Sequence, residues 1–279
     1  MILPLYDSNP KHRIPFQYVT VTLIGICVVV FLWQQTLDPR ASREAVLGLG
    51  AIPAILFGHA DLAPGLAMVP EYATLITSMF MHGGWMHLGG NLLFLWVLGD
   101  NIEDSMGHGR FFVFYLLCGL AAAFAHAAID PQSQTPMIGA SGAISGVIGA
   151  YLILHPKASI HTLVFSFIVA IPAWIVLGMW LGLQLFNVVS GGGGGVAWWA
   201  HIGGAIAGMA LIPLFKHSAV PLFDGIRGTG NETDQQPEGS EPNPAPGPRP
   251  MPRGITITPV ARAAKTPSSP SRKRRRPWH

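Results

Sequence analysis

Charged residues are spaced very unevenly along this chain of 279 residues, and long stretches contain none. The uncharged stretches that are long enough to matter cover residues 14–37, 72–99, 111–129, 131–156 and 158–215. A helix that spans a bilayer needs about 20 mostly apolar residues and tolerates charge poorly at its centre. Only 11% of the residues are charged and 50% are hydrophobic, so a water-soluble globule is not expected.

The longest uncharged stretch is interrupted by Ser190 and the five glycines that follow it, which would break a single helix. It therefore predicts two helices, and the whole chain predicts six. Their expected limits are 18–36, 84–101, 111–128, 139–155, 160–186 and 197–216. The predicted fold class is an all-α polytopic membrane protein.

Basic residues gather on one side of this predicted bundle. With six spans both termini face the same side, which holds all the Lys and Arg residues except Arg40 and Arg43. Because Lys and Arg favour cytoplasmic loops, we predict a multi-pass protein of the cell membrane with both termini in the cytoplasm. The expected organisation is an N-terminal segment at 1–17, a six-helix unit at 18–217 and a tail at 218–279.

The tail is rich in proline and in basic residues. Half of the chain's 24 prolines lie from Pro221 onward, with little apolar clustering, so the tail is predicted to be disordered. Its basic run at 272–276 has three readings: binding to anionic lipid, binding to nucleic acid, or a solvated segment that reinforces topology. The solvated reading is favoured; anionic lipid stays open as a partner, and nucleic acid is not expected.

Polar residues inside apolar spans are costly and often mark function. Ser141 opens the fourth predicted span, and His201 lies one turn into the sixth. A serine hydroxyl needs a nearby base to act as a nucleophile, and histidine is the usual base. Small residues such as Gly142 and Gly204 permit the close helix approach that this pair requires. We predict Ser141 as nucleophile and His201 as general base and acid.

Two further polar residues, His87 and Asn91, are four apart and therefore share one helix face. Attack on a peptide carbonyl creates an oxyanion that needs positioned hydrogen-bond donors. His87, Asn91 and the Ser141 backbone N–H are the candidate donors. Taken singly, a serine in a glycine-rich helix more often packs than reacts, and His82 is expected to bridge helices. The conjunction of nucleophile, base and donors favours catalysis.

The run from His82 to Asn91 (HGGWMHLGGN), the Gly139–Gly142 element (GASG) and His201 followed by small residues resemble the signature regions of the rhomboid intramembrane serine proteases. The resemblance covers about residues 15–217. It implies a six-transmembrane-helix rhomboid-like bundle with a cavity that opens outward. It also implies a catalytic Ser–His dyad with no carboxylate as a third member, and it implies that neither a metal nor a cofactor is needed.

The same resemblance assigns supporting positions. His87, Asn91 and the backbone of the nucleophile would form the oxyanion hole. His82, Gly139 and Gly142 would support the site, and Glu103 matches a family glutamate that supports the inner end of the second span. Some members place an aromatic residue four positions after the nucleophile, where this chain has Ser145.

The predicted function is hydrolysis of peptide bonds in or next to the transmembrane segments of membrane-protein substrates, within the lipid bilayer. Three alternative functions compete with this one. An intramembrane metalloprotease would want His-Glu-x-x-His, but no glutamate lies between His82 and His87. An aspartyl intramembrane protease needs two membrane carboxylates, and Asp100 stands without a partner. A non-catalytic membrane binder or transporter of the same fold has no need of both Ser141 and His201.

Overall fold

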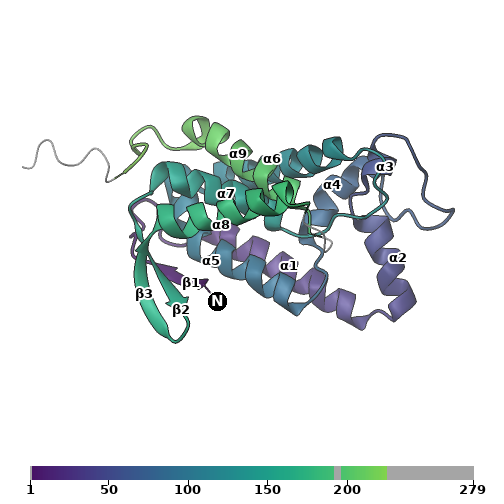
Figure 1. Ribbon diagram of the computed structural model, residues 1–279, viewed down its shortest axis with the longest axis horizontal. Helices are drawn as coiled ribbons and strands as arrows, with labels where there is room; N and C mark the ends of the chain where they lie inside the picture. The colour runs from purple at the N-terminus through teal and green to yellow at the C-terminus, as the bar shows by residue number, and fades with distance from the viewer. Residues whose placement is uncertain (1, 192–195, 225–279) are drawn as a thin grey trace, which may run out of the picture. The chain divides into compact units, whose positions relative to one another are not determined.

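The computed structural model describes residues 2–191 and 196–224, and this part of the chain is mostly helical (Figure 1). The main helices are α1 (Tyr18–Thr36), α5 (Trp85–Met106), α6 (His108–Ile129), α7 (Ser141–Leu154), α8 (Ala173–Val189) and α9 (Trp198–Phe215). The long connection before α5 contains α2 (Pro39–Leu49), α3 (Pro53–Leu56), η1 (Glu71–Ala73), α4 (Thr74–Thr77) and η2 (Ser78–Phe80). From residue 225 on, the predictions made for the tail lie outside the described residues.

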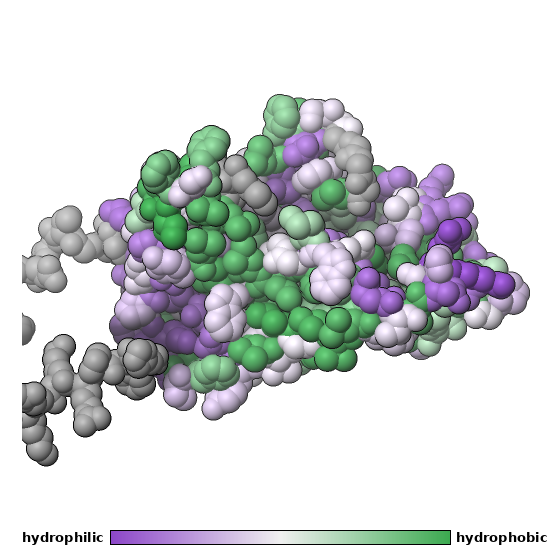
Figure 2. Space-filling view, turned by 90° about the horizontal axis from the view of Figure 1, so that it is seen from below, coloured by the Kyte–Doolittle hydropathy of each residue, from purple (hydrophilic) through white to green (hydrophobic). Residues whose placement is uncertain are grey.

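Within the described residues, three helices are long and apolar enough to cross a membrane: α1, α6 and α9. Helices α7 and α8 are apolar but shorter. Helix α5 has 22 residues and carries Asp100, Glu103 and Asp104 in its last two turns. On the face seen in Figure 2, hydrophobic residues cover much of the middle, and hydrophilic residues gather toward both ends. The count of six spans therefore stays a prediction.

The expected fifth helix at 160–186 is wrong in its first half. Residues there form an antiparallel hairpin of β2 (Ser159–Val164) and β3 (Phe167–Pro172), and the helix α8 begins only at Ala173. A short uncharged apolar run has the same hydropathy whether it forms a strand or a helix, so low charge alone cannot distinguish the two. Pro172 immediately precedes α8, where proline's missing N–H breaks no helical hydrogen bond.

The N-terminal segment contains a strand that the sequence reading did not foresee. Strand β1 (Ile2–Asp7) pairs antiparallel with β2, which gives a three-stranded sheet in the order β1-β2-β3. Pro4 cannot donate a ladder hydrogen bond, and it is placed on an edge strand, where this costs least. The all-α expectation therefore fails at this end of the bundle.

The centre of the bundle is the contact of α7 with α6 and α9. A Cβ atom built on Gly204 of α9 would lie 2.1 Å from the carbonyl oxygen of Gly142 in α7. One turn on, a Cβ atom on Gly208 would lie 2.0 Å from the carbonyl oxygen of Gly146. Only glycine permits such an approach, so the two small-residue faces bring the backbones of α7 and α9 into direct contact.

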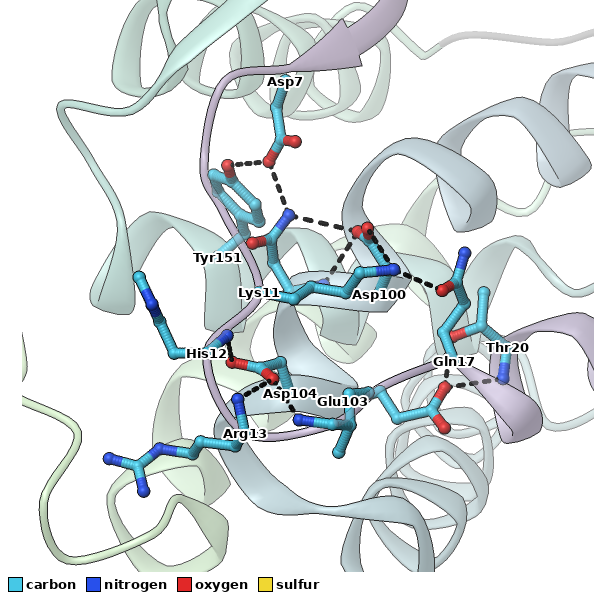
Figure 3. A network of polar contacts seen from close by, with 12 residues as sticks. Asp7, Lys11, His12, Arg13, Gln17, Thr20, Asp100, Glu103, Asp104 and Tyr151 are labelled. Atoms are coloured by element: carbon cyan, nitrogen blue, oxygen red, sulfur yellow. Dashed lines mark hydrogen bonds and ion pairs between the residues drawn. The ribbon is translucent and has the colours of Figure 1, made fainter.

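A polar network joins the N-terminal arm to the end of α5 (Figure 3). The Asp104 carboxylate accepts backbone hydrogen bonds from His12, Arg13 and Ile14 at 2.7–3.0 Å. The carboxylate of Asp7 accepts hydrogen bonds from the hydroxyl of Tyr151 and from the side-chain amide of Asn101. Burial raises the pKa of Asp7 to about 6, because the charged carboxylate loses water on being enclosed.

Candidate active site

Ser141 is the first residue of α7, and His201 lies one turn inside α9. The His201 Nε2 atom is 2.9 Å from the Ser141 Oγ atom, within hydrogen-bond range. The two residues are 60 positions apart in sequence, and the glycine contact between α7 and α9 brings them together. His201 is 8% exposed, so the pair is largely shielded from water.

The second ring nitrogen of His201 also has a partner. His201 Nδ1 lies 2.8 Å from Oε1 of Gln184, which is buried on α8. Sequence reasoning missed Gln184, although it is one of only two side-chain amides in the apolar run of α8 and so carried a signal. No catalytic pattern pointed to it, because it lies 17 residues from His201 on another helix.

Aromatic rings support His201 from positions that the sequence reading did not assign. Trp180 of α8 has its ring centroid 5.6 Å from that of His201, and Trp198 lies edge-on at 6.1 Å. Ser145, which takes the place of an aromatic residue in some relatives, is buried and donates its hydroxyl to the Ser141 carbonyl at 2.6 Å. The packing around the histidine therefore comes from α8 and from the first turn of α9.

His87 lies close to the segment just before Ser141. Its Nδ1 atom accepts a hydrogen bond from the Gly83 backbone N–H at 3.3 Å, which leaves the proton on Nε2. A Cβ atom built on Gly139 would lie 2.6 Å from His87 Nε2. Gly139 has φ +125°, a conformation that glycine tolerates and other residues rarely adopt. The glycine thus lets His87 place an N–H donor two residues before the serine.

Asn91 lies one turn further along α5 and is 7% exposed. Its Nδ2 atom is buried and has no hydrogen-bond partner among the described residues. That nitrogen is 3.7 Å from the position of a Cβ atom on Gly139, so it also faces the segment before Ser141. A buried unpaired donor costs free energy unless a ligand satisfies it, so Asn91 Nδ2 is available to a group bound beside Ser141.

His82 lies beside His87, and their ring centroids are 5.2 Å apart. The His82 Nδ1 atom contacts the Phe80 carbonyl at 3.2 Å, and no hydrogen bond joins His82 to Ser141 or His201 in the described part of the chain. The side chain of Gln34 in α1 brackets the His82 backbone: Oε1 accepts from its N–H at 3.0 Å, and Nε2 donates to its C=O at 3.2 Å. This clamp holds the loop that leads into α5.

Glu103 lies far from this group, because the 16 residues from His87 to Glu103 rise about 24 Å along α5. It is fully buried and accepts hydrogen bonds from the backbone N–H groups of Val19 and Thr20 and from the Thr20 hydroxyl at 2.7–3.0 Å. His108 Nδ1 is 2.5 Å away. Glu103 thus satisfies the first turn of α1, whose N–H groups lack partners within the helix.

Gly142 is the remaining predicted position, and its contacts are packing contacts. Gly142 packs against α6, where a Cβ atom on it would lie 2.7 Å from the Ala122 Cβ atom. Among residues 2–191 and 196–224, no three His, Cys, Asp or Glu side chains gather in a way that could hold a metal ion. The cysteines Cys27 and Cys118 are both buried and free.

The apolar helices and the enclosed serine–histidine pair define a helical membrane protein with a candidate hydrolytic site. The family model of the Rhomboid domain matches residues 69–218, which is about half of the chain and includes all the site residues described above except those of α1. The chain therefore belongs to the rhomboid family.

Curated relatives agree with this assignment. Rhomboid protease GluP of Bacillus subtilis is 33% identical over 192 residues, which cover 68% of this chain and 33% of that protein. Rhomboid protein 1, mitochondrial, of Saccharomyces cerevisiae is 28% identical over 230 residues, or 74% of this chain and 58% of that protein. RHOMBOID-like protein 12, mitochondrial, of Arabidopsis thaliana is 31% identical over 202 residues. The chain spans between one third and three fifths of the length of these relatives.

Proposed function

We propose that this protein is an intramembrane serine endopeptidase that hydrolyses peptide bonds in or next to the transmembrane segments of its substrates. The observation that supports this most is the 2.9 Å contact between Ser141 Oγ and His201 Nε2 inside an apolar helical bundle. The proposed catalytic unit comprises residues 18–217, with α1, α5, α6, α7, α8 and α9 as six membrane-spanning helices. Both termini would face the cytoplasm.

The lengths of the helices support a site inside the bilayer. Ser105 near the end of α5 contacts His155 just after α7, so these helices end at a similar level. Helix α5 has 22 residues and rises about 33 Å, whereas α7 has 14 residues and rises about 21 Å. Ser141 lies 14 residues before His155, as Asn91 lies 14 residues before Ser105, so Ser141 would lie on the level of Asn91, about 9 Å deeper than the start of α5.

The proposed reaction begins when His201 accepts the Ser141 proton as the serine oxygen attacks the substrate carbonyl. The resulting oxyanion would accept hydrogen bonds from His87 Nε2, from Asn91 Nδ2 and from the backbone of Ser141. His201 then protonates the leaving amine, and water hydrolyses the acyl-enzyme. A transmembrane helix hides its backbone in internal hydrogen bonds, so the substrate segment must unwind locally before it reacts.

The test compares purified wild-type protein with Ser141→Ala and His201→Ala in liposomes that contain a reporter transmembrane substrate. We expect both variants to lose cleavage and to lose labelling by a serine-directed phosphonate. Ser145→Ala is the matched control, because Ser145 lies one turn further along α7 and only donates to a backbone carbonyl. Cleavage by Ser141→Ala at the wild-type rate would refute the proposal.

A further inference from the structure

We propose that Gln184 is a positioning residue that fixes the tautomer of His201, so that Nε2 is free to accept the Ser141 proton. The inference rests on the proposed peptidase function and deepens it. Its basis is a chain of two hydrogen bonds that joins three helices through Ser141 in α7, His201 in α9 and Gln184 in α8.

The orientation of the Gln184 amide follows from its second contact. Gln184 Nε2 lies 2.9 Å from the Trp180 carbonyl oxygen, and a carbonyl oxygen only accepts hydrogen bonds. The nitrogen must therefore face Trp180, which leaves the Oε1 atom to face His201.

An acceptor at Oε1 determines the protonation of the ring. Because Oε1 lies 2.8 Å from His201 Nδ1, the neutral imidazole carries its proton on Nδ1 and a lone pair on Nε2. That lone pair faces the Ser141 hydroxyl at 2.9 Å, the arrangement a general base needs. The opposite tautomer would point an N–H at Ser141, which prevents proton transfer, and would set the Nδ1 lone pair against Oε1.

An amide is a physically reasonable choice for this position. Gln184 is 5% exposed, and no Lys or Arg occurs from 158 to 215, so neither α8 nor α9 offers a cation to pair with a carboxylate there. A neutral amide avoids most of the cost of burying a charge and still supplies an acceptor. Trp180 contributes twice, since its carbonyl orients Gln184 and its ring packs on His201. One turn of α8 thus holds the base in place.

The experiment compares Gln184→Leu, Gln184→Glu and the matched control Asn187→Leu. Asn187 lies on the same helix, and its amide donates only to the Leu183 carbonyl at 2.7 Å, so its loss removes an amide without touching His201. Each variant is reconstituted in liposomes with the reporter substrate. The readouts are kcat, KM, the rate of phosphonate labelling at Ser141 and the melting temperature.

For Gln184→Leu we expect kcat and the labelling rate to fall about tenfold relative to Asn187→Leu, with KM unchanged, since one neutral hydrogen bond is lost. Gln184→Glu restores the acceptor, so most of the rate should return. Its acid limb should move to higher pH, because a carboxylate at Nδ1 stabilises protonated His201. His87 and His126 are the other titratable groups that influence His201, and neither changes in these variants.

The tautomer itself gives a readout that needs no catalysis. Nitrogen NMR of histidine-labelled protein, with the His201 signals assigned by comparison with His201→Ala, should show a protonated Nδ1 in the wild type and a mixture in Gln184→Leu. The inference is overturned if Gln184→Leu matches Asn187→Leu in rate and tautomer, or if Gln184→Glu neither restores the rate nor shifts the pH profile. Failure of the proposed function looks different, since the wild type itself would then neither cleave nor be labelled.

A second inference rests on the hairpin of β2 and β3, independently of the site. Its apolar side chains are exposed on both faces of β3: Phe167 is 74% exposed and Ile168 56%, and Phe165 in the turn is 85% exposed. Strand β3 runs directly into α8, whose exposed Trp174 and Leu183 continue the apolar surface. We propose that this hairpin lies in the interfacial layer of the bilayer and contacts lipid.

Two features support lipid as the occupant and place it at that depth. No charged residue occurs from 158 to 215, which suits contact with acyl chains. However, β3 is an edge strand, and the unpaired backbone groups of an edge cannot lie in the hydrocarbon core. Figure 1 shows the hairpin extending sideways from the ends of the helices, as a segment lying along the membrane surface would.

A fluorophore on Ile168→Cys tests this inference, with Asp61→Cys, which replaces an exposed charged residue, as the control. The native Cys27 and Cys118 are fully buried, so the label goes to the introduced cysteine. In phosphatidylcholine liposomes we expect lipid-borne nitroxide to quench the label at 168 and aqueous iodide to quench the label at 61. Equal iodide quenching at both positions, or self-quenching at 168 that shows a second copy seated there, would overturn it.

Discussion

The contact between α7 and α9 makes a quantitative prediction for Gly204→Ala. The added Cβ atom would lie 2.1 Å from the Gly142 carbonyl oxygen, whereas a carbon and a carbonyl oxygen need at least about 3.3 Å. The two helices must therefore separate by about 1.2 Å at this point. His201 is three residues from Gly204 and Ser141 is next to Gly142, so the 2.9 Å contact should lengthen to about 4 Å.

That separation exceeds hydrogen-bond range, so the base no longer reaches the serine. A misplacement of about 1 Å costs about 100-fold in rate, and we expect kcat to fall by about that factor. Overpacking should also lower the free energy of unfolding by about 1–3 kcal/mol. The assay is substrate cleavage and phosphonate labelling by the folded fraction, isolated by size-exclusion chromatography in detergent.

Gly182→Ala is the matched control, because a Cβ atom at Gly182 of α8 meets no atom within 4 Å. It should keep wild-type activity and stability. If folded Gly204→Ala cleaved and labelled as fast as Gly182→Ala, the reasoning that this glycine contact sets the distance between Ser141 and His201 would be refuted.

Three further predictions concern other contacts. Glu103→Ala leaves several donors at the first turn of α1 unpaired and should lower the free energy of unfolding by at least about 3 kcal/mol. The control Glu44→Ala loses only an exposed ion pair with Arg40 and should barely shift the melting temperature. The raised pKa of Asp7 favours its protonated form in the folded state, so the free energy of unfolding should fall as pH rises from about 4 to about 6. In thermal melts, Asp7→Asn should flatten that pH dependence and be more stable than the wild type at pH 7. Gly139→Ala should displace His87 and lower kcat, and its strained φ should also lower the melting temperature; wild-type kcat in the folded fraction of this variant would contradict the placement of His87.

Much of the site followed from residue types and spacing. Ser141, His201, His87 and Asn91 each stand where their polarity is costly, and helical periodicity alone puts the last two on one face. Their roles remain predictions that the experiments above test. Gln184 and Trp180 were missed because they act from a separate helix, and no spacing rule relates α8 to the histidine of α9.

The hairpin shows why the fold was only partly predictable. Hydropathy measures the cost of exposing a residue to water, and that cost is the same whether the residue lies in a strand or in a helix. The partner strand decides between them here, because β1 from the N-terminus pairs with β2. That pairing joins residues about 157 positions apart in sequence, so no local pattern records it.

The sequence by itself determined that this is an apolar, mostly helical chain with a serine, two histidines and an asparagine at the spacing of the rhomboid signature regions, because charge and polarity are local properties of residues. The tertiary structure decided which of these groups touch. The glycine faces of α7 and α9 set the Ser141–His201 distance, and α8 supplies the amide at His201 Nδ1. Such contacts depend on how closely whole helices approach, which the packing of many residues fixes together.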